Sequence, residues 1–269
     1  MFDVHTHAFP ESIARKAVDN LEKFFNGLKA KYIPSYRNLR NLLRRYNFKG
    51  AFIQNVATNP QQVEKLNDLA HRMNSRLAGK VKLIFSGVFH GEYEGYEREI
   101  ERMKKLRIYF VKFQPEFQNF DPLSKEFLKF IDMMKDRFFF VFHCGYEYSS
   151  PNKKEFTVTP KKLVKIKDLI PRAKIVAAHM GGVLMWDEVL EHLAGRDIWI
   201  DTSGAAGLIE ESKAKEIFKN HRRDRILFGT DYPFFGFRET IEFVKRNSGE
   251  DLKVFAEENP QKLLALFEG

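Results

Sequence analysis

The sequence contains one cysteine, Cys144, among its 269 residues. A single cysteine cannot form an internal disulfide or supply a four-cysteine zinc site. Because Cys144 follows a histidine at the end of an apolar run, we expect it to be a small packed residue and not a nucleophile. No run of about 18 apolar residues without charge is present, so no membrane-spanning segment is expected. The first residues do not resemble a signal peptide, and we predict a cytoplasmic protein.

No charged stripe is present either. The chain has 45 Lys and Arg against 36 Asp and Glu, for a net charge of +9. A surplus of this size could attract acidic ligands, but the basic residues are scattered and not interleaved with aromatic residues. Nucleic acid is therefore disfavoured as a partner, and a small-molecule substrate is favoured.

Short apolar runs rich in Val, Ile and Phe recur along the whole chain. They are mostly continuous, without a clear alternation of apolar and polar residues, as is typical of strands buried on both faces. We expect eight strands, at Phe2–His7, Gly50–Val56, Lys82–Val88, Ile108–Gln114, Phe138–His143, Lys174–His179, Ile198–Ser203 and Arg225–Asp231.

Charged segments with helical spacing separate these runs. Eight strands alternating with helices predict an α/β fold, a (β/α)8 TIM barrel, as a single domain over residues 1–269. A doubly wound open sheet is the alternative, but it usually has a glycine-rich turn after its first strand, where this chain has His-Thr-His. The first crossover, from Glu11 to Lys49, is long enough for two helices.

Potential metal ligands stand at the ends of four of the eight runs. His5 and His7 are two positions apart on one strand, so their side chains point the same way and can bind one divalent ion. His143, His179 and Asp231 end three further runs. Each alone could be a buried structural residue or a helix cap. Their combination at the end of a barrel where active sites form predicts a metal site.

Four segments of the chain resemble the amidohydrolase superfamily, in particular the amidohydrolase-related group that includes aminocarboxymuconate semialdehyde decarboxylase. Together they span nearly the whole sequence and are more specific than any one alone. They are Asp3–Pro10 (DVHTHAFP), His179–Gly182 followed by Trp186, Phe228–Pro233 (FGTDYP) and Glu258–Leu264 (ENPQKLL).

This resemblance implies a role for each residue of the predicted site. It implies that the metal ligands are His5, His7, His143 and Asp231, and that the acid/base pair is Asp231 and His179. The implied cofactor is one divalent ion, most simply Zn²⁺, with Mn²⁺ and Fe²⁺ as alternatives for the same ligands. Asp3 lies on the same strand face as His5 and His7. It is a candidate for supporting these metal-binding histidines, or it makes a buried structural contact.

The role of Lys112 stays open at this point. It ends the fourth run, where two-metal members of the superfamily carry a bridging glutamate or a carbamylated lysine. Lys112 could be such a bridge, a cation facing a substrate carboxylate, or part of an ion pair. The other candidate substrate contacts are Trp186 and Tyr146, the latter at the start of a loop that could form a wall or lid.

The favoured function is a metal-dependent hydrolase that uses metal-activated water on an amide, ester or lactone of a small, carboxylated substrate. The alternative is a metal-dependent, non-oxidative decarboxylase. A metal-dependent deoxyribonuclease is less favoured, because such enzymes normally have a glutamate where this chain has Lys112. On base rates we expect a homodimer. His71, His192 and His221 lie in charged helical segments and are expected to face solvent.

Overall fold

The computed structural model describes residues 1–25, 28–75, 81–146, 156–249 and 251–268. Every run expected to be a strand contains one, and the third is divided in two at Ser86. All paired strands are parallel. The strands are β1 (Phe2–Thr6), β2 (Gly50–Ile53), β3 (Lys82–Phe85), β4 (Gly87–Val88), β5 (Phe110–Phe113), β6 (Phe139–Phe142), β7 (Lys174–Ala177), β8 (Trp199–Asp201) and β9 (Ile226–Leu227).

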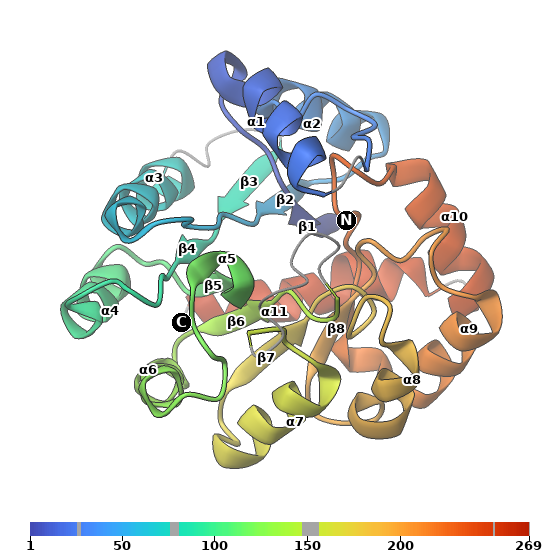
Figure 1. Ribbon diagram of the computed structural model, residues 1–269. Helices are drawn as coiled ribbons and strands as arrows, with labels where there is room; N and C mark the ends of the chain where they lie inside the picture. Colours follow the sequence, from blue (N-terminus) through green and yellow to red (C-terminus); the bar gives the residue numbers. More distant parts are fainter. Residues whose placement is uncertain (26–27, 76–80, 147–155, 250, 269) are drawn as a thin grey trace.

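The strands form a closed ring. Pairing runs β1-β2-β3 and β4-β5-β6-β7-β8-β9, and β3 continues into β4 through Ser86, whose N–H donates to the Ile53 carbonyl at 3.0 Å. The last strand returns to the first, since Val4 N–H donates to the Phe228 carbonyl at 2.9 Å. Figure 1 shows the strands at the centre with helices around them. The predicted (β/α)8 barrel is confirmed.

The helices mostly occupy the crossovers between successive strands. Two of them, α1 and α2, fill the long first crossover, as the sequence predicts. The α-helices are α1 (Glu11–Phe24), α2 (Tyr36–Arg45), α3 (Val63–Ser75), α4 (Tyr96–Lys105), α5 (Pro115–Gln118), α6 (Lys125–Met134), α7 (Pro160–Leu169), α8 (Trp186–Glu188), α9 (Glu211–Asn220), α10 (Phe237–Ser248) and α11 (Asn259–Glu268). Short 3-10 turns are η1 (Pro60–Gln62) and η3 (Arg223–Arg225), and π-helical turns are η2 (Val189–Leu193) and η4 (Val254–Glu258).

The barrel interior is filled with apolar side chains at the end opposite the predicted site. The residues in contact there are Phe2, Val4, Phe52, Phe110, Phe139, Val141, Val176, Trp199, Leu227 and Leu263. Leu263 comes from α11, which crosses behind the strands in Figure 1. The lower barrel is therefore a packed core, and a binding site can form only at its other end. Within the described residues, no helix has the length and apolar character needed to cross a bilayer.

Candidate active site

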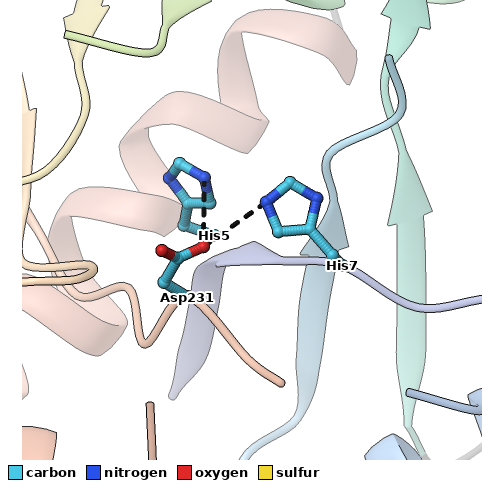
Figure 2. A group of neighbouring side chains, drawn as sticks. All are labelled: His5, His7 and Asp231. Atoms are coloured by element: carbon cyan, nitrogen blue, oxygen red, sulfur yellow. Dashed lines mark ion pairs between the residues drawn. The ribbon is translucent and has the colours of Figure 1, made fainter. Parts of the chain in front are cut away.

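Three predicted site residues meet where β1 and β9 end. His5 and the residue just after β1, His7, face the carboxylate of Asp231, which follows β9 (Figure 2). The Asp231 Oδ1 atom lies 3.4 Å from His7 Nε2 and 3.8 Å from His5 Nε2. The pairing of β1 with β2 shifts register between Asp3 and Thr6. Such an irregularity changes the direction of nearby side chains, and here it lies at the strand end that carries the two histidines.

Hydrogen bonds determine which nitrogen of each ring carries the proton. His7 Nδ1 lies 3.0 Å from the Gln54 carbonyl oxygen, which can only accept, so Nδ1 donates. His5 Nδ1 lies 2.9 Å from Asp201 Oδ2, which also accepts. The Lys112 ammonium, which can only donate, lies 3.3 Å from His5 Nε2. The unprotonated Nε2 of His5 and the imidazole of His7 thus lie beside the Asp231 carboxylate, and this set of ligand types fits a divalent cation.

His143 and His179 form a pair of their own. His143 Nδ1 lies 2.9 Å from His179 Nε2, so one of these nitrogens donates and the other accepts. His179 in turn approaches Asp231, with 4.0 Å between Nδ1 and Oδ2. Among the described residues, the compact groups of metal-type ligands are His5–His7–Asp231 and His5–His179–Asp201. His143 belongs to neither and reaches the cluster through His179.

Asp201, at the end of β8, is a site residue that the sequence analysis does not identify. It is fully buried and accepts from His5 Nδ1, while its Oδ1 accepts from the backbone N–H groups of His179 at 3.1 Å and Ser203 at 3.0 Å. The Ser203 hydroxyl also donates to it. The sequence could have identified Asp201, because this residue lies near the end of an apolar run, as His143 and His179 do. Its role in the geometry is to hold His5 and His179 in place.

Asp3 connects the first strand to the loop that carries Asp231. Its Oδ1 accepts from the N–H groups of His5 at 3.1 Å and Thr230 at 3.0 Å, and its Oδ2 accepts from the Thr230 hydroxyl at 2.6 Å. Burial raises the pKa of Asp3 to about 7, against the opposing effect of these hydrogen bonds. Asp3 therefore binds backbone and Thr230, and it does not contact the His5 or His7 ring through any of these bonds.

The pKa values of the buried groups determine the charge state of the site. Burial alone would raise the pKa of Asp231, but the close approach of His7 and of the other nearby imidazoles lowers it below its usual range. Burial and the neighbouring Lys112 ammonium lower the pKa of His5 to about 4. Burial likewise lowers the pKa of His143 and His179. At neutral pH this geometry favours an ionised Asp231 among neutral imidazoles, which is the state that binds a cation.

The backbone is strained at both acid/base candidates. His179 has φ +63° and Asp231 has φ +68°, in the left-handed region that non-glycine residues seldom adopt. Such conformations persist only where the surroundings hold them in place. The Trp186 indole N–H donates to the His179 carbonyl at 3.2 Å, and the Asp231 N–H donates to the His5 carbonyl at 2.9 Å. These bonds tie the His179 turn to Trp186 and the Asp231 turn to β1.

A cavity of about 450 Å³ opens over this cluster. Its polar end is formed by His5, His7, Lys112, His143, His179 and Asp231. Tyr146 also lines it, as predicted, whereas residues 147–155 of the same loop lie outside the described residues. Trp186 differs from its predicted place. It is 7% exposed and is not a lining residue, because its ring packs in the core and its N–H supports His179.

Solved structures share this fold at low sequence identity. An uncharacterised TIM-barrel protein from Bordetella bronchiseptica matches with a TM-score of 0.74 at 13% identity, over 100% of both chains. A dihydroxybenzoic acid decarboxylase from Polaromonas sp. JS666, with bound manganese, matches at 0.65 and 15%, over 99% of this chain and 96% of that one. A Pseudomonas putida protein described as a 2-pyrone-4,6-dicarboxylic acid hydrolase matches at 0.62 and 15%, over 99% and 97%.

A curated relative matches part of the sequence. The decarboxylase orsB of Emericella nidulans is 30% identical over 121 residues, which are 36% of this chain and 36% of that protein. The chain thus spans about a third of the length of this relative. The family model described as amidohydrolase matches residues 2–266, nearly the entire sequence. It confirms the resemblance found in the sequence motifs, and the protein is an enzyme that belongs to the amidohydrolase family.

Proposed function

We propose that the protein is a metal-dependent decarboxylase that releases CO₂ from a small aromatic carboxylic acid. The observation that carries this proposal is the position of Lys112. Its side chain is 1% exposed and lies at the polar end of a cavity whose other walls are mainly apolar. A substrate carboxylate placed beside this buried ammonium would gain an opposite charge and lose its hydration on entry. Apolar surroundings then favour the step in which the carboxylate becomes neutral CO₂.

The cation site supports the same proposal. His5, His7 and Asp231 would hold one divalent ion, with His143 as a fourth ligand. The bound ion would act as a Lewis acid on substrate oxygen atoms. Imidazole and carboxylate ligands suit Zn²⁺, and the manganese in the Polaromonas decarboxylase makes Mn²⁺ an equal choice. One ion is favoured over two because Lys112 lies within 3.3 Å of His5 as a hydrogen-bond donor, not as a ligand.

The chain's own residues would manage the proton. In decarboxylation the bond between the ring carbon and the carboxylate breaks, and the electron pair stays on the carbon, which takes a proton. Asp231 and His179, 4.0 Å apart at their nearest atoms, are the groups we assign to hold and deliver that proton. The hydrogen bond between His179 and His143 provides a second position for it. Lys112 would bind and orient the carboxylate before it leaves.

Hydrolysis is the second candidate, and it is the function that the sequence analysis favours. The same residues would serve it, and the comparisons do not favour it over decarboxylation. The observation in its favour is the low pKa of Asp231, which leaves an ionised carboxylate free to accept a proton from water. A deoxyribonuclease is disfavoured further, because the cavity walls are mainly apolar and Lys112 is the only Lys or Arg among the described lining residues.

The decisive experiment compares CO₂ release with hydrolysis on one preparation. The protein is loaded separately with Zn²⁺, Mn²⁺ and Fe²⁺ and assayed against hydroxybenzoic acids, and in parallel against amides, esters and lactones of matched size. We expect CO₂ release that a chelator abolishes and added metal restores. Hydrolytic turnover without CO₂ release would establish the second candidate instead.

Two lysine variants test the role of Lys112, on which the proposal rests. Lys112→Met removes the cation at the polar end of the cavity, and we expect it to lower kcat/KM for decarboxylation by at least 100-fold, on the order of one charged hydrogen bond. Lys161→Met, on the exposed side of α7, is the matched control and should retain activity. Equal activity of the two variants would contradict the assigned role of Lys112.

A further inference from the structure

The cavity has charge at one end only. Lys112 is the only Lys or Arg that lines it within the described part of the chain, and it lies beside His5 at the bottom. Asp231 is the only acidic lining residue among those described. A ligand with one anionic group can place that group against Lys112 and the cation site. A second anionic group would have no described basic residue to meet.

The remaining walls are mainly apolar and come mostly from elements outside the catalytic cluster. Helix α1 contributes Ile13, Ala17 and Leu21, which are spaced three or four residues apart and so lie on one face of the helix. The adjacent face of α1 holds Ala14 and Val18, both buried against the body of the protein. The same helix thus packs with one face and lines the cavity with another.

Apolar side chains continue from these walls to the cavity mouth. Ile13, Leu28 and Leu208 are each at least 40% exposed, and Tyr146 is 53% exposed. All four line the same cavity. Exposed large apolar side chains are ordinary when scattered, but a group around one opening marks a place where apolar surface is covered by a ligand. A volume of about 450 Å³ is within the range of pockets that enclose drug-sized molecules.

We propose that the substrate is an amphiphilic monoanion, with one carboxylate at the Lys112 end and an apolar body, such as a ring bearing an alkyl chain, that extends past α1 toward the rim. This inference rests on the proposed function in that Lys112 and the cation site define the reacting end. It adds that dicarboxylic acids of similar size are rejected, because their second carboxylate would lie against apolar wall residues such as Ile13 and Leu21, where no described basic side chain lines the cavity.

Binding of substituted benzoates tests the proposal without requiring turnover. The probes are benzoate with methyl, propyl and pentyl groups at position 4, and terephthalate, which has a carboxylate there. Their dissociation constants are measured by calorimetry on the metal-loaded protein. We expect the dissociation constant to fall roughly fourfold for each added methylene, as for apolar surface transferred from water. Terephthalate should bind at least tenfold more weakly than 4-propylbenzoate.

Two variants of α1 locate the alkyl chain. Ile13→Asp places a charge in the apolar wall at a position that is 48% exposed, so the fold should tolerate it. In this variant we expect the gain per methylene to disappear. Ser12→Asp adds the same charge to the neighbouring exposed residue, which does not line the cavity, and should retain the wild-type dependence on chain length.

The outcomes separate this inference from the proposed function. If the benzoates bind with the expected dependence on chain length but no acid of either assay releases CO₂, decarboxylation fails and the amphiphilic pocket stands. If an acid is decarboxylated while affinity does not change with chain length, or terephthalate binds more tightly than 4-propylbenzoate, the inference is overturned. Absence of binding by 4-pentylbenzoate at millimolar concentration also overturns it. The terephthalate comparison needs no variant and holds even if Ile13→Asp does not fold.

Discussion

The Asp201 carboxylate accepts from the ring of His5 and from the backbone of His179, so two residues of the site depend on one buried group. Its pKa is lowered below the usual range, because the nearby His5 and His179 outweigh the opposing effect of burial. As an ionised acceptor, it keeps the proton of His5 on Nδ1 and leaves Nε2 unprotonated. Partners of this kind commonly determine how well a histidine binds metal.

We therefore expect Asp201→Asn to weaken divalent-cation binding by 10- to 100-fold. Whichever way the amide is oriented, its NH₂ group replaces an acceptor and faces an N–H or O–H donor. Affinity is measured by competition with a chromophoric chelator for Zn²⁺ at neutral pH. Asp187→Asn is the control, because the Asp187 side chain is 81% exposed and pairs only with Lys213 among the contacts found. Unchanged affinity in Asp201→Asn would mean that the Asp201 carboxylate does not determine which nitrogen of His5 carries the proton.

The sequence was sufficient to predict His5, His7 and Asp231 together, because potential ligands at the ends of parallel strands must meet at one end of a barrel. It was not sufficient for side chains whose role depends on direction. Trp186 turns into the core, and His143 forms a hydrogen bond with His179 that the sequence does not reveal. His221, expected to face solvent, is 4% exposed, since a charged helical segment does not reveal which way its last side chain turns.

At the scale of elements, the loop after β8 brings the backbone close to both acid/base candidates. Gly204 there has φ +61°, and a Cβ atom built on it would lie 3.0 Å from His179 Nδ1 and 3.2 Å from Asp231 Oδ2. These contacts are tighter than ordinary van der Waals contact. The loop thus needs glycine for its left-handed conformation and also for the approach of two reactive side chains.

Gly204→Ala should therefore reduce kcat/KM at least tenfold, by displacing His179 or Asp231. Gly207→Ala is a matched control in the same loop, because it has φ +85° and nothing within 4 Å of its added Cβ. Both variants should lose about 1 kcal/mol of unfolding free energy from backbone strain. Turnover and denaturant unfolding are measured together. A similar loss of activity in both variants would attribute the effect to strain and not to contact with the site.

The apolar runs of the sequence predicted each strand. They did not predict which face of each helix packs on the barrel and which lines the cavity. The apolar spacing of α1 predicts a helix equally well whether its apolar residues pack on the barrel or line a cavity. Only the structure shows that Ala14 and Val18 face the body while Ile13 and Leu21 face the cavity. The division of the third run at Ser86 was likewise invisible, because one polar residue inside an apolar run is common in continuous strands.

At the scale of the whole molecule, the site exists because the barrel closes. Asp3 on the first strand holds Thr230 beside the last one, and the Asp231 N–H donates to the His5 carbonyl. The candidate metal ligands from the two ends of the sequence are therefore aligned by the same contacts that close the ring. A cation that binds only the closed barrel stabilises it by mass action, so binding and folding are coupled in this protein.

Far from the site, His221 connects the end of α9 to the segment before β8 and makes stability depend on pH. Its Nε2 lies 3.0 Å from the Ile198 carbonyl before β8, and its Nδ1 accepts from the Gly195 N–H at 3.3 Å. Nε2 must donate and Nδ1 must accept, so only the neutral ring makes both bonds. Burial lowers the pKa of His221 to about 4. Protonation is thus disfavoured in the folded state relative to the unfolded state.

The sign of the pH effect follows from this difference. Above about pH 6.5 His221 is neutral in both states and contributes no dependence on pH. As the pH falls from about 6.5 towards 4, the unfolded chain binds a proton that the folded chain does not, so unfolding free energy falls by about 1.4 kcal/mol per pH unit.

In His221→Gln this loss should be absent. We expect the stability advantage of the wild type over the variant to shrink by about 2 kcal/mol between pH 7 and pH 5. Denaturant unfolding with a chelator present keeps the active-site histidines in the same metal-free state in both proteins. An advantage that stays constant over this range would show that His221 binds its proton alike in the folded and unfolded protein, and that the Gly195 bond does not hold it neutral.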